Sequence, residues 1–265
     1  MVADSPSRSR GERPVGELLR QWRSNRRRSQ LDLAVEAGIS SRHVSFIETG
    51  RSRPTAAMIL RLAEHLDVPL RERNQLLLAG GFAPAYGERD LDTPELAAVC
   101  DALRRVVAAH MPFPALVLDR HFDVVEANEA VATVVEGCAP ELLTPPVNVI
   151  RLGLHPEGMA PRITNLDQWR AHLLTQLTRR AGRTGDRRLI DLLDEVRRYP
   201  RPARLGGVDG GVAVELRLRH RLGDLAFLSM AASVQTALDV TVDELTLELF
   251  HPADDATRAL MESVR

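Results

Sequence analysis

The strongest constraint on the fold is a series of five short amphipathic segments between residues 15 and 79, each followed by a signal that ends a helix. In the first segment, apolar residues recur at positions i, i+3, i+4 and i+7, the spacing of one face of an α-helix. These residues are Val15, Leu18, Leu19 and Trp22, and we expect Trp22 in the core. Short amphipathic helices bury their apolar faces by packing against one another. The segment therefore predicts an all-α domain of five helices.

A tight turn separates the second and third expected helices. Ser29 is suited to cap a helix over residues 30–37, and Ser40 is suited to cap the next one. Gly38 lies between them, where glycine commonly ends a helix. The fourth and fifth helices are predicted to begin at Thr55 and Pro69.

Charge is divided unevenly along the chain. Residues 1–87 contain 14 arginines against 9 acidic residues, whereas the remaining 178 residues contain 21 against 27. The two parts therefore carry opposite charge, although the formal net charge is only -1. All 35 basic residues are arginine, which excludes enzyme classes that need a Schiff-base or phosphate-loop lysine. The basic part is suited to a polyanion such as nucleic acid.

The basic helical segment resembles the helix-turn-helix domain of phage-repressor and Cro-like (XRE) regulators. The motifs that carry the resemblance are LRQWR at 19–23, SQLDLA at 29–34, GIS at 38–40, VSFIETG at 44–50 and RP at 53–54. The resemblance implies a double-stranded DNA operator as partner, with the third helix in the major groove.

The same resemblance implies roles for individual residues. The expected DNA contacts are Gln30, Ser41, Arg42, His43, Ser45, Phe46, Arg51 and Arg53. Arg42 suits the guanine edge and Phe46 a thymine methyl, with a solvated Arg42 and a partly buried Phe46 as the alternatives. Gln30 matches a phosphate-holding glutamine, and Arg51 and Arg53 match phosphate contacts that position the domain. Arg23 and Glu48 match an internal ion pair.

The composition changes after the fifth helix. Residues 81–94 are rich in glycine, proline and polar residues and predict a linker. Residues 1–14 have no apolar face and predict a disordered basic arm. The expected domains are therefore a helix-turn-helix domain over 15–80 and a second domain over 95–265.

The second domain shows strands on both sides of a helical region. Strands are predicted at 115–118 and 122–126, followed by helices within 148–199. After a glycine-rich loop, three further strands are predicted at 212–219, 225–231 and 245–249. This order predicts an α+β domain in which an antiparallel sheet is covered on one face and carries a helical insert.

Three segments of this domain resemble the MmyB-like regulator ligand-binding domain, which has a PAS-like fold. They are PALVLDRHFDVVEANEA, NVIRLGLHPEGMAPRITNLDQWRAHLLTQL and VDELTLELFHP, and the resemblance spans about residues 95–262. It implies a hydrophobic pocket for a fatty-acid-like molecule. The candidate lining residues are Phe113, Trp169, Leu173, Phe227 and Met230, for which plain core is the alternative because pockets and cores share a composition.

Signals for catalysis and for metal binding are weak. The eight histidines are scattered, so a metal site requires the fold to bring together His121, His155 or His172. Two cysteines are too few for a disulfide framework, and no apolar run is long enough to cross a bilayer. We therefore expect no catalytic residue, no metal, no cofactor, no membrane partner and a cytoplasmic location.

These patterns predict a homodimeric, DNA-binding transcriptional regulator that is not an enzyme and is tuned by a small hydrophobic ligand. Dimerisation is expected because one recognition helix buries too little surface for tight specific binding. Two alternatives stay open: the second domain only dimerises or docks a protein partner, or it is a DNA-tethered lipid or ester hydrolase. An open space of about 300 Å³ or more would separate a sensor from a filled module.

Overall fold

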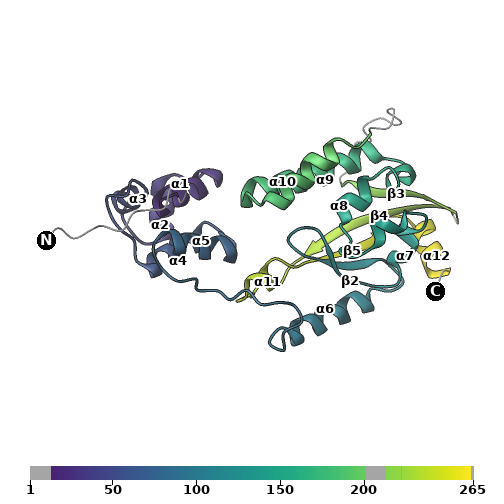
Figure 1. The fold of residues 1–265 in the computed structure, drawn as a ribbon, viewed down its shortest axis with the longest axis horizontal. Coiled ribbons are helices and arrows are strands. Elements are labelled where there is room, and N and C mark those ends of the chain that lie inside the picture. The colour runs from purple at the N-terminus through teal and green to yellow at the C-terminus, as the bar shows by residue number, and fades with distance from the viewer. Residues whose placement is uncertain (1–12, 201–212, 222, 264–265) are drawn as a thin grey trace. The chain divides into compact units, whose positions relative to one another are not determined.

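The computed structural model describes most of the chain (Figure 1). The described residues are 13–200, 213–221 and 223–263. The expected basic arm lies outside them except for its last two residues, and so does the glycine-rich loop before the third strand.

The chain forms two compact units. The first contains the chain up to Glu88 together with Ala237–Asp243, and the second contains Arg89–Thr236 and Glu244–Arg265. A short segment from late in the chain therefore belongs to the N-terminal unit, a pairing that the sequence analysis did not anticipate.

Five helices form the main part of the first unit, as predicted. They are α1 (Val15–Asn25), α2 (Gln30–Glu36), α3 (Ser41–Glu48), α4 (Ala56–His65) and α5 (Leu70–Ala79). The side chains of Ser29, Ser40 and Thr55 accept backbone N–H groups at the starts of α2, α3 and α4. Gly38, with φ +60°, makes the left-handed turn between α2 and α3, a conformation that favours glycine.

Close packing of α1 on α3 depends on Gly16. A side-chain carbon at this position would lie 2.2 Å from the carbonyl oxygen of Ile47. The surrounding core includes Leu19, Leu33 and Ile47, each 1% exposed, and the predicted core residue Trp22. The five helices thus enclose a closely packed apolar centre.

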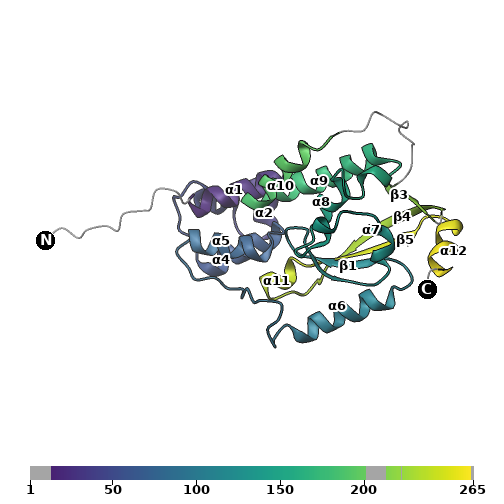
Figure 2. The same ribbon diagram turned by 45° about the vertical axis from the view of Figure 1, so that its right-hand side comes forward.

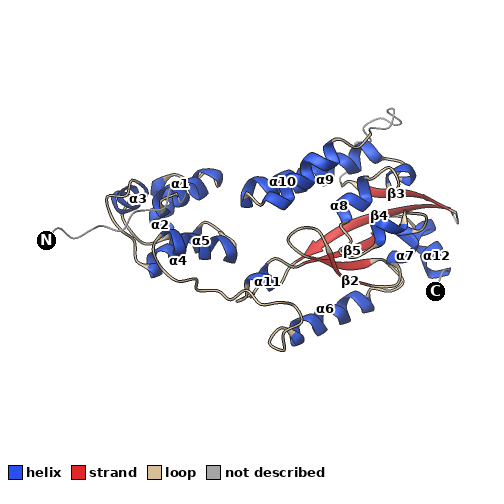
Figure 3. Ribbon diagram, viewed as in Figure 1, coloured by secondary structure: helices blue, strands red, loops and turns tan. Residues whose placement is uncertain are grey.

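The second unit is built on a five-stranded antiparallel sheet (Figure 3). The strands are β1 (Ala115–Leu118), β2 (Val124–Ala127), β3 (Glu215–His220), β4 (Gly223–Ala232) and β5 (Thr246–Pro252). Their order is β2-β1-β5-β4-β3, and each neighbouring pair is antiparallel. The predicted α+β fold, with a helical insert between two early and three late strands, is confirmed.

Helices lie on both faces of this sheet, which corrects the expectation of a single covered face. The α-helices of the unit are α6 (Ala97–Ala109), α7 (Val131–Val135), α8 (Val149–Leu154), α9 (Leu166–Thr184), α10 (Arg187–Arg197) and α12 (Asp255–Ser263). Two 3₁₀ helices are η1 (Pro140–Leu143) and η2 (Ala160–Arg162). Figure 2 shows α6 on one side of the sheet and α8 and α9 on the other.

The sequence of β1 explains the two layers. All four of its residues are buried, because Val117 packs in the α6 cluster while Leu116 and Leu118 pack in the insert cluster. A strand buried on both faces reads as a continuous apolar run rather than an alternating one. The run Ala115–Leu118 is such a sequence.

The remaining helix, α11 (Val240–Asp243), lies between β4 and β5 in the sequence but belongs to the first unit. Val240 and Val242 are 1% and 4% exposed. The backbone N–H of Val240 donates to the carbonyl of Gly87 at 2.8 Å. The carboxylate of Asp243 accepts the backbone N–H of Leu70 at 3.1 Å.

Candidate DNA-reading surface and ligand cavity

A buried glutamate, Glu48, connects the first three helices. Arg23 donates two hydrogen bonds to its carboxylate, from Nε at 2.6 Å and from Nη2 at 2.8 Å. The amide nitrogen of Gln30 donates to the same carboxylate at 2.8 Å. Hydrogen bonding to Glu48 raises the pKa of Arg23 above its ordinary value. The end of α3 is therefore fixed to α1 and α2 by one charged group.

The residues expected to contact DNA lie on α3 and on the segments beside it. Ser41 and Arg42 are exposed in the first turn of α3, and His43, Ser45 and Phe46 are half-buried along it. Arg51 and Arg53 are exposed in the loop that follows. Gln30 begins α2, where its amide is oriented by Glu48. The structure thus brings these positions together on one short helix and its flanks.

Two guanidinium groups lie near the ring of Phe46. The central carbon of Arg42 is 5.1 Å from the ring centroid, and that of Arg51 is 5.9 Å away. Both distances are within the range of cation–π attraction. The half-buried ring therefore makes cation–π contacts with two arginines at the exposed side of α3.

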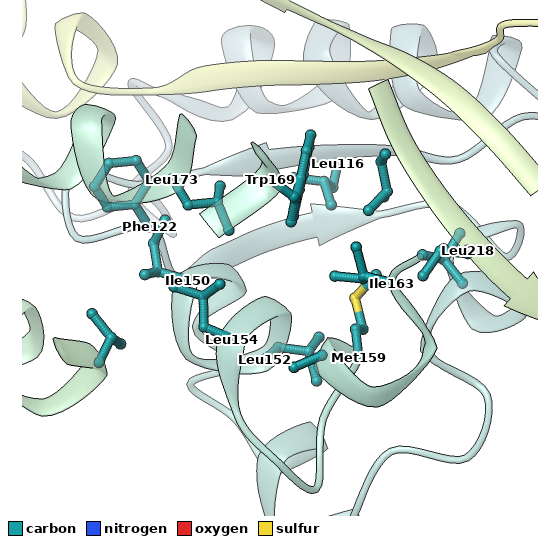
Figure 4. Packing of buried hydrophobic residues seen from close by; sticks show 14 of the residues in the cluster. Leu116, Phe122, Ile150, Leu152, Leu154, Met159, Ile163, Trp169, Leu173 and Leu218 are labelled. Carbon is teal, nitrogen blue, oxygen red and sulfur yellow. The ribbon is translucent and has the colours of Figure 1, made fainter. Parts of the chain in front are cut away.

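An apolar cavity lies against the sheet face opposite α6. Its volume is about 230 Å³. The lining residues come from the sheet, from α7, α8 and α9 and from the connections between them: Pro114, Leu116, Val124, Ala127, Val131, Val134, Val135, Leu143, Val147, Val149, Leu152, Gly153, Met159, Trp169, Leu173, Leu216, Glu248 and Phe250. Figure 4 shows Leu116, Trp169 and Leu173 in the same buried cluster as Leu152 and Met159.

One polar residue in this lining, Glu248 on β5, was missed by the sequence analysis. Its carboxylate accepts the hydroxyl of Ser229 at 2.6 Å. Burial raises the pKa of Glu248 above its ordinary value, and the hydrogen bond from Ser229 opposes this only partly. The signal was present in the sequence, because strand alternation places Glu248 on the same face as the core residue Phe250.

Comparisons with known families cover both units. The model of the MmyB-like transcription regulator ligand binding domain matches residues 99–263, and that of a helix-turn-helix domain matches residues 14–76. The chain belongs to the MmyB-like transcription regulator family. Its two matched regions are a helix-turn-helix domain and the ligand-binding domain of that family.

Individual proteins also align with this chain. The uncharacterized HTH-type transcriptional regulator RghRB of Bacillus subtilis (strain 168) is 39% identical over 83 residues, which are 31% of this chain and 58% of the relative. The match thus spans just over half the length of that curated relative. A solved structure of an RNA-binding light-oxygen-voltage receptor aligns with 98% of this chain and 64% of its own, at 16% identity and a TM-score of 0.29. That score is too low to support an argument.

The structure separates the five residues that were expected to line the pocket of the MmyB-like regulator. Trp169 and Leu173 line the cavity, whereas Phe113, Phe227 and Met230 are outside its lining. Phe227 is fully buried against Phe250, with ring centroids 6.3 Å apart. Phe113 is half-buried, 5.9 Å from the ring of His110.

Met230 lies on the other face of the sheet. It is 46% exposed and pairs with Leu249, which packs with the α6 cluster. Successive strand residues point to opposite faces, so Ser229 and Met230 cannot both face the cavity. The cavity side of β4 at this point is occupied by Ser229, the partner of Glu248.

The three histidines considered as metal ligands lie in different surroundings. His155 packs edge-on to Tyr199 at 5.0 Å, and His172 stacks on Trp169 at 5.4 Å. His121 lies close to Asp119 and Asp123 in a group with metal-ligating atoms. Arg188, however, is hydrogen-bonded to both His121 and Asp123. A guanidinium at that point supplies the positive charge that a metal ion would otherwise supply, so the group is explained as an ion-pair cluster.

Within the described ranges, no helix combines the length and the apolar character needed to cross a bilayer.

Proposed function

We propose that this MmyB-like regulator is a cytoplasmic, XRE-type homodimer whose operator affinity is set by a small hydrophobic, fatty-acid-like ligand in the cavity. The observation that carries the proposal is the open apolar space of about 230 Å³ inside a core cluster. Protein interiors are otherwise packed as closely as organic crystals, with few voids larger than a water molecule. The volume is below the about 300 Å³ that by itself would separate a sensor from a filled module, so the proposal is restricted to a slender acyl chain and the filled module stays an alternative.

The size of the reading element supports dimerisation. Helix α3 has 8 residues, and it carries most of the expected base contacts. A single module of this kind buries too little surface for the affinities typical of specific operators. Two copies related by a two-fold axis would place their recognition helices about 34 Å apart on a palindromic site.

The α11 segment supports a route from ligand to DNA. The N-cap of α5, Pro69, makes no side-chain capping bond, and Asp243 instead accepts the N–H of Leu70. Strand β5 begins at Thr246, three residues after Asp243, and carries Glu248 into the cavity lining. A ligand that prefers one position of β5 would therefore shift the population of the capped state of α5.

The proposal assigns no reaction to the cavity. Its described lining residues include no serine, cysteine or histidine, and Glu248 is the one carboxyl among them, so the lining holds no pair of a nucleophile and a general base for the hydrolase alternative. No metal or cofactor is assigned. A docking module with no ligand is kept as an outcome of the first experiment.

The first experiment is native mass spectrometry of the purified full chain, followed by extraction of any small molecule. We expect a dimer with a bound acyl compound, and we expect addition or removal of that compound to change operator affinity. A dimer without ligand, whose operator affinity is unchanged by added alkyl compounds, would support the docking module instead.

A second experiment tests the DNA-reading surface. Arg42→Ala is expected to weaken operator binding by about 1–3 kcal/mol and to relax base preference at one position, measured by titration against single-base operator variants. Arg105→Ala, an exposed arginine on α6, is the matched control and should have little effect. An equal loss on every DNA sequence would make Arg42 a phosphate contact.

A third experiment tests the α11 route. Asp243→Asn is expected to reduce the effect of ligand on operator affinity, from the about 5- to 150-fold typical of allosteric coupling towards no effect. Ligand affinity itself should be nearly unchanged, because Asp243 is outside the cavity lining. Asp255→Asn, at an exposed helix start, is the control. Full coupling in Asp243→Asn would exclude this route.

A further inference from the structure

The chemistry of the cavity lining is strongly one-sided. Of the lining residues, Glu248 alone has an ionisable side chain, and Trp169 supplies the one other polar side-chain atom. No arginine or histidine is among them, and the chain contains no lysine. Among the described lining residues, there is therefore no cation to balance a ligand carboxylate.

Glu248 lies where the polar end of an amphiphilic ligand would be expected. Its partner on β1, Leu116, is 6% exposed, whereas its partner on β4, Ala231, is exposed. The residue is thus at the margin of the covered part of the sheet, with the apolar lining on one side and solvent on the other. Amphiphiles place their chain in the apolar interior and their head group at such a margin.

The surroundings of Glu248 favour its neutral form. Its one hydrogen bond among the described contacts comes from the Ser229 hydroxyl, which occupies an acceptor position on Oε1. Burial raises the pKa of the carboxyl. A carboxyl in its protonated form is a hydrogen-bond donor, and with Oε1 accepting from Ser229 the second oxygen is the one available to donate.

We propose that Glu248 selects aliphatic ligands whose head group is an uncharged oxygen acceptor, such as an alcohol or an ester, over ligands with a carboxylate. The proton of the Glu248 carboxyl donates to the ligand oxygen, and Ser229 holds the other carboxyl oxygen. A ligand carboxylate at the same place would set two acidic groups side by side with no counter-charge, an arrangement that permits only one of them to ionise. This inference rests on the proposed ligand-binding function and changes one part of it: the ligand keeps the aliphatic chain of a fatty-acid-like molecule, but its head group is not a free carboxylate.

The test compares two probes of equal chain length, 1-dodecanol and dodecanoate, by calorimetric titration of the full chain near neutral pH. We expect the wild-type protein to bind dodecanol at least about tenfold more tightly, which corresponds to about 1.4 kcal/mol. Glu248→Gln keeps the shape of the side chain and cannot ionise. It should therefore reduce the preference to within about threefold, mainly by binding dodecanoate better.

Glu129→Gln, an exposed glutamate outside the lining, is the control and should keep the wild-type preference. Dodecanoate binding to wild type as tightly as dodecanol would overturn the inference, and that measurement needs no variant. A preference that is unchanged in Glu248→Gln would also overturn it. Binding of neither probe to any of the proteins would overturn the ligand-binding function itself.

Discussion

Each of the two units contains a glutamate in an apolar environment, and the two carboxyl groups have different hydrogen-bond partners. Glu48 in the helical unit receives hydrogen bonds from both Arg23 and Gln30. Glu248 in the sheet unit receives one from Ser229 and faces a cavity. The charge of the Glu48 carboxylate is balanced by Arg23. The Glu248 carboxyl has one oxygen without a hydrogen bond among the described contacts.

The contrast between these two carboxyl groups indicates a different role for each unit. The helical unit holds α3 in one position, since a reading helix must present its side chains at a fixed angle to the groove. The sheet unit keeps an open volume and an unused hydrogen-bonding group, both of which lower its stability unless something else occupies them. The hydrogen bonds to Glu48 thus connect three helices of the helical unit, whereas the sheet unit contains an open cavity.

The largest effect is expected from breaking the balanced charge. Glu48→Ala leaves the Arg23 guanidinium, whose side chain is 12% exposed, without its buried partner. Removing one member of a buried ion pair typically costs about 3–5 kcal/mol, so we expect the free energy of unfolding of the helical unit to fall by this amount. Urea denaturation of the full chain in a Trp169→Phe background, followed by the fluorescence of Trp22, measures it, because Trp22 and Trp169 are the two tryptophans of the chain.

Glu36→Ala is the matched control, because Glu36 pairs with Arg28 at the surface. We expect a loss of less than about 1 kcal/mol there. Similar losses of unfolding free energy for the two variants would show that the Arg23–Glu48 pair stabilises the protein no more than a surface pair. The contrast between Glu48 and Glu248 would then not hold.

A smaller effect on stability is expected from adding side-chain atoms at a closely packed position and at the cavity wall. Gly16→Ala places a methyl group against the Ile47 carbonyl oxygen, which is backbone and cannot move aside as a side chain can. Overpacking of this kind costs about 1–3 kcal/mol of unfolding free energy. Ala127→Val adds two methyl groups at the cavity wall and should change stability by no more than about 0.5 kcal/mol. Thermal unfolding of both variants measures the two changes in unfolding free energy. Equal losses would mean that the cavity cannot accommodate the two added methyl groups.

The smallest effect is a dependence on pH. Because the pKa of Glu248 is raised on folding, its contribution to stability is fully present below the unfolded pKa and is lost as the pH rises through the folded pKa. Glu248→Gln removes this loss, so the variant should gain stability relative to wild type as the pH rises above the ordinary pKa of a glutamate. All other groups are common to both proteins. Parallel stability curves for the two proteins would contradict the raised pKa.

The helical unit was largely predictable from local sequence signals. Capping serines, the turn glycine and apolar residues at helical spacing act over one or two turns, so Ser29, Ser40 and Gly38 could be assigned without knowing the fold. The strands were found by the same means, although the second begins at Val124 rather than Phe122, because Phe122 takes a positive φ in the turn. The cavity was harder to predict, and only Trp169 and Leu173 among the expected residues line it.

The helices and most strand positions could be predicted from the amino-acid sequence, because they depend on the periodicity and chemistry of neighbouring positions. The DNA-contacting residues stay a prediction. Only the tertiary structure decided which apolar residues surround open space, since a pocket wall and a filled core have the same composition. The tertiary structure also shows that Asp243 accepts the N–H of Leu70 at the start of α5, 173 positions away, and that Glu248 on β5 accepts the hydroxyl of Ser229 on the neighbouring strand β4. Contacts of this kind depend on how distant segments pack, and no local pattern records that packing.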